Sequence, residues 1–337
     1  MKSQINVGLI GTGRLGSMYA KFLSQRVPSA NLAAVADLIP DKAQRVAKKH
    51  DVPKWYDNHH DLNVDKDVEA VIITATTSNH KEIVIDAAQT GKPIFCEKPM
   101  TLTLEDAHEM KEAVRSAGVF YQQGYMRRFD KGFAAVKQKI EEGVIGKPVV
   151  FRGSSRDPYL PELDYLLPEN SGGQILDMAI HDYDIARWYM GDIHTVYAIG
   201  GVLAFPEVEK TGDTDNVVMA FTFQSGALGE IDISRNGVYG YDIRAEVLGT
   251  KGTLKAGYLR DTPVLVMTKE GVTHDVVPYF PQRFREAYVE QLKDYIDNLQ
   301  SDSVPMIGID DGVYGLKVAV AATDSLHENK VVDVSKY

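Results

Sequence analysis

Three glycines near the start of the chain constrain its fold most strongly. Gly11, Gly13 and Gly16 follow an apolar, strand-like run at residues 5–10 and precede a segment with helical spacing at residues 14–26. Gly11 would permit a tight turn, Gly13 would let backbone N–H groups approach a pyrophosphate, and Gly16 would allow close helix–strand packing. The helix N-terminus would present unpaired N–H donors to the phosphates. The pattern predicts a dinucleotide-binding loop; the alternative is a plain strand-to-helix turn.

Strand-like and helical patterns alternate over roughly the first 125 residues. The predicted strands lie at residues 5–10, 32–36, 70–75, 93–96 and 120–123. The predicted helices lie between them, at residues 14–26, 42–50, 80–90 and 104–117. Such alternation indicates βαβ units around a parallel sheet. We therefore predict an α/β domain over residues 1–125, with a doubly wound Rossmann sheet.

The pattern changes after this point. The predicted strands now follow one another, at residues 149–154, 196–203, 217–223, 228–234, 244–248 and 264–267. Helical patterns remain at residues 133–142, 174–190, 283–300 and 311–328. We predict an α+β domain over residues 126–337 with a large, mostly antiparallel open sheet, whose last helix can pack back on the Rossmann domain. Such a sheet needs cover on its second face, so we expect a homo-oligomer.

The composition excludes several classes of protein. Of 337 residues, 44% are apolar, and no run approaches the roughly 18 apolar residues of a membrane span. The chain starts without the apolar stretch of a secretion signal, and Cys96 is its single cysteine. These features predict a soluble, cytoplasmic protein. A net charge of −10 without a Lys/Arg cluster argues against a nucleic-acid partner and favours a small neutral substrate.

Asp37 bears on the choice of cofactor. It ends the second predicted strand, about 20 residues beyond Gly16, where a carboxylate accepts hydrogen bonds from the adenosine ribose and repels a 2′-phosphate. The next residues, beginning with Leu38, include no nearby arginine. We therefore predict NAD; the alternative role for Asp37 is a helix N-cap, for which Asp41 is better placed. The cofactor contacts predicted so far are Gly11, Thr12, Gly13, Arg14, Leu15, Gly16, Asp37 and Leu38.

A second cofactor segment follows the predicted strand 70–75. It carries Thr76, Ser78, Asn79 and His80 at the carboxyl edge of the sheet, where open α/β sheets bind ligands. We predict that these residues line the cofactor. Ser78 or Asn79 could also cap the next helix, and both roles are compatible.

Glu97, Lys98 and Pro99 follow the predicted strand 93–96 at the same edge. Lys98 there can hydrogen-bond a substrate hydroxyl, and its positive charge favours alkoxide character as a hydride leaves. Glu97 and Lys98 are also predicted cofactor contacts, and Pro99 allows a cis bond. The alternative for Lys98 is a solvated surface lysine. We interpret Cys96 as a small buried hydrophobe and not a nucleophile.

Asp177 and His181 lie on the predicted helix 174–190. Their i and i+4 spacing puts both side chains on one helix face. A histidine titrates near neutral pH and can take a hydroxyl proton, while the carboxylate holds the substrate or sets the charge of the imidazole. A structural histidine is one alternative. A metal site with Asp182 and Asp184 is another, but the spacing lacks the usual ligand pattern, so we predict no metal.

These motifs together resemble the oxidoreductase family named after glucose–fructose oxidoreductase, inositol dehydrogenase and the rhizopine catabolism protein. The resemblance covers essentially the whole chain and rests on residues 11–16, Glu97-Lys98-Pro99, and Asp177 with His181. Within the family, the run Gly124-Tyr125-Met126-Arg127-Arg128-Phe129-Asp130 is close to the Gly-Phe-Met-Arg-Arg-Tyr-Asp of bacterial inositol dehydrogenases.

The resemblance implies roles for individual residues. Lys98 would be the catalytic lysine, His181 the proton acceptor, and Asp177 its partner and a substrate ligand. Further substrate contacts implied by the family are Met126, Arg127, Asp157, Tyr159, Tyr239 and Tyr241. The family also implies oligomers, often tetramers, built through the open sheet. The implied reaction is NAD-dependent oxidation of an inositol hydroxyl; because residues 155–171 depart from the myo-inositol enzymes, scyllo-inositol is favoured over myo-inositol.

Two other functions stay open at this stage. One is a dehydrogenase acting on another sugar, although the mixed charges of the predicted pocket favour a neutral substrate. The other is a non-catalytic NAD-sensing regulator. Such regulators are expected to have lost the lysine or the histidine, and this chain keeps Lys98 and His181.

Overall fold

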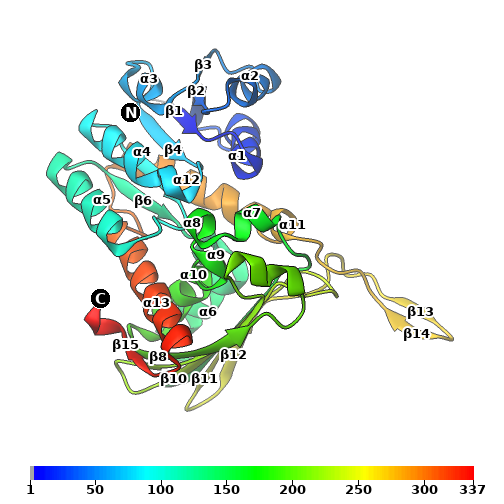
Figure 1. Ribbon diagram of the computed structural model, residues 1–337. Coiled ribbons are helices and arrows are strands. Elements are labelled where there is room, and N and C mark those ends of the chain that lie inside the picture. Colours follow the sequence, from blue (N-terminus) through cyan, green and yellow to red (C-terminus); the bar gives the residue numbers. More distant parts are fainter. Residues whose placement is uncertain (1–3) are drawn as a thin grey trace. The chain divides into compact units, whose positions relative to one another are not determined.

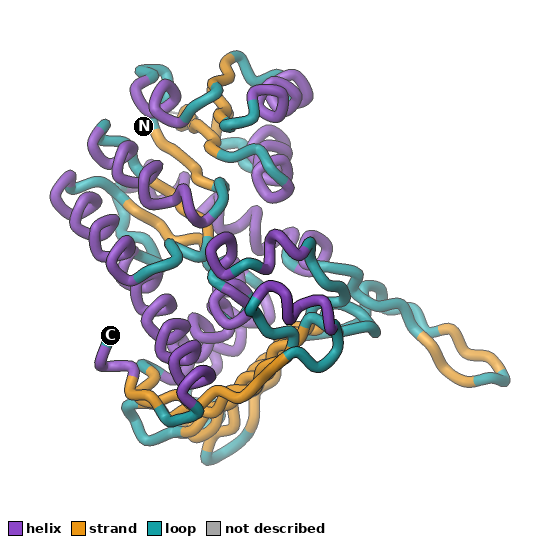
Figure 2. Tube along the Cα trace, in the orientation of Figure 1, coloured by secondary structure: helices purple, strands orange, loops and turns teal. Residues whose placement is uncertain are grey.

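The computed structural model describes residues 4–337 in two units, traced in Figures 1 and 2. The first unit comprises the described residues up to Tyr125 together with Tyr288–Leu316, and the second comprises Met126–Ala287 and Lys317–Tyr337. Residues 288–316, which we assigned to the C-terminal domain from the sequence, therefore group with the first unit. Within residues 4–337, no helix combines the length and apolar character needed to cross a membrane.

The first unit is built on a parallel sheet, as predicted, but the sheet has six strands where the sequence predicted five. Its strands are β1 (Ile5–Ile10), β2 (Ala30–Ala36), β3 (Lys54–Tyr56), β4 (Ala70–Ile73), β5 (Ile94–Glu97) and β6 (Tyr121–Gly124). The strands are ordered β3-β2-β1-β4-β5-β6, so the chain adds β2 and β3 on one side of β1 and β4, β5 and β6 on the other. The loops after β1 and β4 therefore lie at the switch point where such sheets bind ligands. Its helices include α1 (Arg14–Gln25), α2 (Pro40–Lys49), α3 (His59–Val64), α4 (Thr77–Gln89) and α5 (Leu104–Ala117).

The second unit holds a seven-stranded mixed sheet. Its strands are β7 (Pro148–Arg156), β8 (Ile193–Gly201), β9 (Asn216–Phe223), β10 (Leu228–Ser234), β11 (Asp242–Gly249), β12 (Thr253–Ala256) and β15 (Val332–Asp333). Their order is β12-β11-β7-β10-β9-β8-β15, and only β7 and β10 pair in parallel. The predicted large, mostly antiparallel sheet is thus confirmed.

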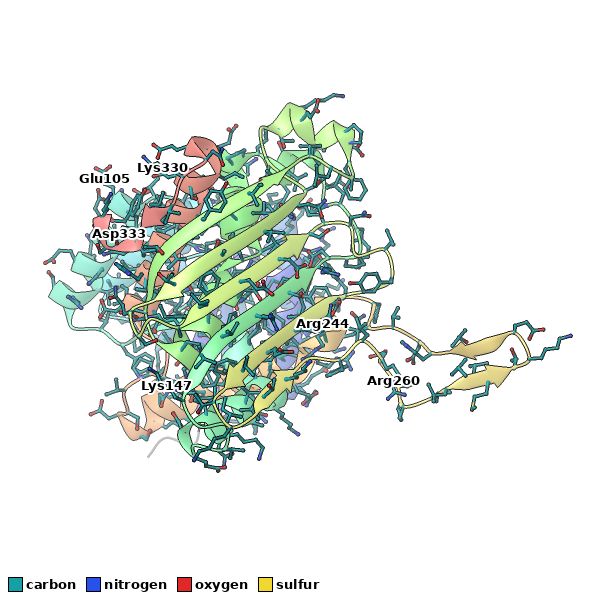
Figure 3. All side chains as sticks on the ribbon, turned by 90° about the horizontal axis from the view of Figure 1, so that it is seen from below. Glu105, Lys147, Arg244, Arg260, Lys330 and Asp333 are labelled. Atoms are coloured by element: carbon teal, nitrogen blue, oxygen red, sulfur yellow. The ribbon has the colours of Figure 1, made fainter. Side chains whose placement is uncertain are left out.

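Only one face of this sheet is covered. Along β9, Val217, Met219, Phe221 and Phe223 are buried while Val218 is exposed, the alternation expected of a half-buried strand. Figure 3 looks onto the open face, where charged side chains pair between neighbouring strands. The remaining elements are η1 (Met126–Phe129), α6 (Lys131–Glu141), α7 (Leu163–Leu166), α8 (Pro168–Ser171), α9 (Gly173–Asp177), α10 (Ile180–Met190), η2 (Pro206–Thr211), α11 (Phe280–Arg283), α12 (Arg285–Ser301), α13 (Ile309–Glu328) and η3 (Val334–Lys336).

Two sequence expectations are wrong in this unit. The helix predicted at 174–190 is broken into α9 and α10. At the end of α9 the Met178 N–H bonds the carbonyl oxygen of Gln174, four residues before it. At the start of α10 the Asp182 N–H bonds that of Ala179, only three residues before it. The strand predicted at 264–267 does not join the large sheet. Instead β13 (Val266–Thr268) and β14 (Gly271–Thr273) form a separate hairpin that projects from the unit (Figure 1).

Candidate active-site residues

The loop after β1 has the geometry that its glycines predict. Gly11 has φ +90°, and a Cβ there would lie 2.5 Å from the backbone nitrogen of Ala75. A Cβ on Gly16 would lie 1.9 Å from the carbonyl oxygen of Gly11. Gly13, in contrast, has no described atom within 4 Å of its added Cβ. Gly11 and Gly16 are therefore required by packing, whereas Gly13 faces open space that a diphosphate can enter.

Helix α1 begins directly at this open space. Its N-cap is Gly13, which has no side chain to bond the first N–H groups, and its first turn, starting with Arg14 and Leu15, contains no acidic residue. The N-terminal N–H groups and the positive end of the helix dipole thus suit an anionic group. The loop fits the diphosphate of NAD.

Asp37 lies beside the same loop. One carboxylate oxygen accepts hydrogen bonds from the backbone N–H of Thr12 at 2.7 Å and from its hydroxyl at 2.8 Å. The other accepts from Ile39 N–H at 2.9 Å. The N-cap of α2 is Ile39, so neither Asp37 nor Asp41 caps that helix. The negative charge at the loop disfavours a 2′-phosphate there, and Leu38 is exposed beside it.

The segment after β4 contacts this loop and also the lysine segment. Thr74 donates its hydroxyl to the carbonyl oxygen of Gly11 at 2.7 Å. The two ring nitrogens of His80 lie 2.9 Å from the carbonyl oxygen of Pro99 and 3.0 Å from that of Ala75. Burial lowers the pKa of His80, and a neutral ring can donate its single N–H to only one of these two carbonyl oxygens. A cofactor contact of His80 stays a prediction.

Thr76 is the N-cap of α4, which begins at Thr77. Ser78 and Asn79 therefore lie in the first turn and do not cap the helix, contrary to the alternative that the sequence left open. The Asn79 amide donates to the Thr76 hydroxyl at 2.9 Å. These residues stay predicted cofactor contacts, at the carboxyl end of β4.

Lys98 follows β5 and precedes a cis peptide bond to Pro99. Its own N–H donates to the Glu97 carboxylate at 3.1 Å, and the Gln291 amide donates to the same carboxylate at 3.1 Å. The hydroxyl of Tyr19 donates to it as well. Glu97 is 3% exposed, and burial raises its pKa. The Glu97 side chain therefore supports the Lys98 backbone from inside the unit; a direct cofactor contact of Glu97 stays a prediction.

Cys96, just before this segment, is fully buried, and burial raises the pKa of its thiol far above the usual range. The interpretation of Cys96 as a small buried hydrophobe is confirmed.

Asp177 ends α9 in a buried polar cluster of the second unit. Tyr165 donates its hydroxyl to Asp177 Oδ1 at 2.8 Å, and Arg235 Nη2 lies 3.5 Å from Asp177 Oδ2. The same nitrogen lies 3.7 Å from Asp213 Oδ2, so the fully buried guanidinium stands between two carboxylates. The charge of Asp177 raises the pKa of Tyr165, which keeps that hydroxyl protonated as a donor.

The N-terminus of α9 is fixed by the same cluster. Asp213 accepts a hydrogen bond from the Gln174 N–H at 2.8 Å, and burial raises the pKa of Asp213. His181 lies in the first turn of α10 and is 7% exposed. The residues between, Met178 and Ala179, keep right-handed helical φ and ψ, so about one helical turn still separates Asp177 from His181.

The aspartates beside His181 bind arginines. Asp182 pairs with Arg127 at 2.7 Å and accepts the Ser155 hydroxyl at 2.7 Å. Asp184 forms a two-nitrogen ion pair with Arg128. These pairs account for both carboxylates, and within residues 4–337 no group of three or more His, Cys, Asp or Glu side chains is arranged to hold a metal.

Arg127 and Met126, both predicted substrate contacts, are each 2% exposed in η1. Arg127 also donates to Ser155 at 3.0 Å, while its buried Nε–H makes no hydrogen bond to a described residue. One donor of this guanidinium is thus left for a ligand. Contact of either residue with substrate stays a prediction.

The predicted tyrosines divide into two groups. Tyr241 packs against Tyr279 with ring centroids 5.4 Å apart, and Tyr159 packs against Tyr279 at 4.8 Å. Asp157 is near enough to raise the pKa of Tyr241, after the larger effect of burial. Tyr239 instead bonds Asp242 at 2.8 Å and accepts from Arg156 at 3.1 Å, in a groove on the open sheet face.

The comparisons with known proteins agree along the whole chain. Residues 5–125 match an oxidoreductase family's NAD-binding Rossmann fold, and residues 137–334 match the C-terminal alpha/beta domain of the same family. The chain belongs to this oxidoreductase family.

Two relatives illustrate the similarity. The oxidoreductase is 41% identical over 334 residues to the myo-inositol 2-dehydrogenase of Thermotoga maritima, covering 98% of this chain and 99% of the relative. It is 38% identical over 335 residues to the scyllo-inositol 2-dehydrogenase (NAD(+)) of Bacillus subtilis, covering 99% and 97%. The solved scyllo-inositol dehydrogenase from Lactobacillus casei, with bound NAD(H) and scyllo-inositol, superposes with a TM-score of 0.94 at 29% identity and covers 98% of this chain and 99% of its own.

Sequence reasoning missed several residues of the oxidoreductase's two clusters. Tyr19 and Gln291 hold Glu97, while Tyr165, Arg235 and Asp213 surround Asp177. Each lies far along the chain from the residue that it supports. A buried arginine such as Arg235 carries the only usable signal, because a guanidinium inside a protein requires carboxylate partners.

Proposed function

We propose that the protein oxidises one secondary hydroxyl of an inositol to the ketone, using NAD, with scyllo-inositol favoured over myo-inositol. The observation that carries the proposal is that one chain combines an open glycine loop and Lys98 at the carboxyl edge of its parallel sheet with a buried Asp177 and His181 one helical turn apart. The similarity to scyllo- and myo-inositol dehydrogenases supports it.

The residues that would hold NAD are those of the loop after β1, Asp37 with Leu38, and the segments at Thr76–His80 and Glu97–Lys98. When bound, NAD⁺ would supply the acceptor for the hydride of the carbinol carbon, and the residues of this chain would have to remove the hydroxyl proton. Asp37 beside Thr12 supports a preference for NAD over NADP.

Lys98 would donate a hydrogen bond to the reacting hydroxyl and stabilise its alkoxide character. His181 would take the hydroxyl proton. Asp177, with Arg235 3.5 Å away, would accept a hydrogen bond from a neighbouring hydroxyl and stabilise a protonated imidazole. The proposal requires both units to bring Lys98 and His181 to one carbon when substrate is bound.

An inositol ring is neutral and offers only hydroxyls, so its site must supply side chains that hydrogen-bond them. A ligand that lacks one of these hydroxyls leaves a buried polar group unpaired and binds more weakly. Met126, Arg127, Asp157, Tyr159 and Tyr241 would line the site, and Tyr239 is the further candidate.

The protein would work in the cytoplasm as a homo-oligomer, a dimer or tetramer. The single cysteine, Cys96, is buried and reduced, which supports a cytoplasmic location. The open sheet face exposes Ile199, Val218 and Leu228, which supports a homo-oligomer.

The decisive experiment is a substrate panel with purified protein. Scyllo-inositol, myo-inositol, glucose and a uronate are each incubated with NAD or NADP, and the absorbance of reduced cofactor is followed. We expect reduction of NAD with an inositol and a higher kcat/KM for scyllo-inositol. Turnover of an aldose alone would indicate a sugar dehydrogenase, and NAD binding without any turnover would indicate a regulator; either result overturns the proposal.

A further inference from the structure

Helix α9, which ends at Asp177, is too short to hold its own position. It spans only the five residues Gly173–Asp177, and a helix of this length is marginal in water without tertiary contacts. The two residues at its start, Gly172 and Gly173, have φ of +79° and +77°, so the chain enters the helix through a left-handed bend. The position of the Asp177 carboxylate therefore depends on what holds the first turn of α9.

Gln174, which is fully buried, holds this turn. Its backbone N–H donates to Asp213 Oδ1 at 2.8 Å. Its side-chain amide donates to the carbonyl oxygen of Asp215 at 2.9 Å and accepts from the Thr214 hydroxyl at 2.9 Å. A single residue of α9 thus bonds three consecutive residues just before β9. We call these residues, 213–215, the frame.

The frame is itself fixed to the chain before it. The Asp215 carboxylate is fully buried and accepts the backbone N–H groups of residues 203, 204 and 205 at 2.8, 2.8 and 2.6 Å. Hydrogen bonds from N–H groups to a carboxylate are stronger than those between neutral groups. The frame therefore gives Gln174 a fixed point to which α9 is tied.

The same frame holds Arg235, the ion-pair partner of Asp177. The Arg235 N–H donates at 2.9 Å to the carbonyl oxygen of Asp215, which is the oxygen that also accepts from Gln174. The guanidinium of Arg235 lies 3.5 Å from Asp177 Oδ2. Both charges of this pair are thus tied to one segment, Asp177 through Gln174 and the guanidinium through its own backbone. A shift of α9 against the frame would change the distance between the two charges and hence their attraction.

We propose that Gln174 is a positioning residue for the reaction: by tying α9 to the frame, it sets where the Asp177 carboxylate stands. Gln174 acts through Asp177 and is not assigned a contact with substrate. A misplacement of about 1 Å in a group that holds substrate can lower a catalysed rate by roughly 10²-fold. The inference rests on the proposed function, because that function is what gives Asp177 a substrate to hold.

The test is a double-mutant cycle between Gln174 and Asp177. Gln174→Met keeps the length of the side chain but removes both hydrogen bonds that its amide makes with the frame. Asp177→Asn removes the charge that Gln174 is proposed to place. We measure kcat and KM for the polyol that the wild type oxidises best, and the dissociation constant of the same polyol from the enzyme–NADH complex by NADH fluorescence. The second measurement completes the cycle even where turnover is slow.

We expect Gln174→Met to lower kcat/KM about tenfold in the wild type but less than about twofold in Asp177→Asn, because two residues that act through one contact do not have additive effects. The polyol dissociation constant should follow the same pattern. The affinity for NAD should stay that of the wild type in every variant, since the loop after β1 is unchanged.

A milder variant covers the case in which Gln174→Met folds poorly. Thr214→Val keeps the shape of its side chain and removes one hydrogen bond to Gln174, so it should lower kcat/KM about threefold and have no further effect in Gln174→Met. The matched control is Thr323→Val in α13, which loses a hydroxyl bond of 2.9 Å to the Ala319 carbonyl oxygen. It should turn over like the wild type.

Three results would contradict the positioning role. Equal losses from Gln174→Met in the wild type and in Asp177→Asn would show a general effect on the fold and overturn it. Normal kcat/KM in both Gln174→Met and Thr214→Val would overturn it as well, while the proposed function would stand in either case. A wild type that oxidises no polyol would instead overturn the proposed function, and the positioning role with it.

Discussion

The cofactor edge of the first unit and the Asp177 cluster of the second are held by different kinds of contact. At the cofactor edge the loop is shaped by its backbone, because Gly11 and Gly16 leave no room for a side chain. Around Asp177 the contacts are between buried charges, with Arg235 between two carboxylates. Backbone shape binds a group common to many dinucleotide enzymes, whereas charged side chains distinguish one substrate from another.

The largest effect is expected at Lys98, the proposed catalytic lysine of the first unit. Lys98→Ala should lower kcat by about 10³-fold, because the hydroxyl loses the positive charge that stabilises alkoxide character. NAD affinity, measured by fluorescence titration, should stay near that of the wild type, since the loop after β1 is unchanged. Near-normal turnover would show that Lys98 is not catalytic and that the first unit serves only to bind the cofactor.

The buried charges should matter next. Arg235→Met leaves Asp177 and Asp213 facing each other without the guanidinium and should destabilise the protein by about 3 kcal/mol, measured by urea unfolding. Adding Asp213→Asn should restore part of this loss, because one of the two carboxylates is then neutral. The matched control is Arg152→Met on the open sheet face, whose ion pair with Glu230 is half exposed and should contribute less than about 1 kcal/mol.

Two glycines can separate packing from binding at the cofactor edge. Gly16→Ala should lower the melting temperature, because its Cβ would overlap the Gly11 carbonyl oxygen. Gly13→Ala should melt like the wild type but bind NAD roughly tenfold more weakly, since its methyl group occupies space left for the diphosphate. Equal NAD affinity in Gly13→Ala and the wild type would argue against the diphosphate lying there.

Asp37 tests the choice between cofactors. Asp37→Ala should weaken NAD binding several-fold and weaken NADP binding less, because the lost carboxylate bonds the ribose of one and repels the phosphate of the other. Dissociation constants for both cofactors, measured by calorimetry, give the ratio. An unchanged ratio would contradict the assignment.

The smallest effect concerns pH. His80 has a lowered pKa in the folded protein, so below about pH 6.5 the unfolded chain binds a proton that the folded chain does not. The free energy of unfolding should therefore fall as pH drops below this value and rise toward neutral pH. Melting curves between about pH 5 and 7.5 should show a shallower slope for His80→Gln than for the wild type. Identical slopes would exclude His80 as the titrating group.

Much of the first unit could be predicted from the sequence because its signals are local. A strand, three glycines and a helix follow one another between residues 5 and 25, and each signal reinforces the next. The strand β3 and the helix α3 were missed because they are only three and six residues long, too short to show a hydrophobic period.

The second unit was harder to predict because its decisive contacts join distant parts of the chain. Lys98 was predicted from its place after a strand, and Asp177 and His181 from their helical spacing, and the family resemblance then gave them roles. Nothing near Asp177 in the sequence points to Arg235 or Asp213. Helical spacing was likewise insufficient after Met178, where Asp182 N–H bonds the carbonyl oxygen three residues before it although the apolar pattern continues. The local sequence pattern predicts helices and strands. The partners of a buried charge can be identified only from the tertiary structure.

The hydrogen bond from Gln291 to Glu97 has a consequence for the order in which the protein is completed. Tyr295, on the same helix, reaches back in the same way to the carbonyl oxygen of Val71 at 3.2 Å. On the ribosome, the six parallel strands emerge long before this helix does. The Glu97 carboxylate therefore has no hydrogen bond from Gln291 until this helix has been synthesised. The half of the molecule that is synthesised first is therefore finished only after most of the other half has been translated.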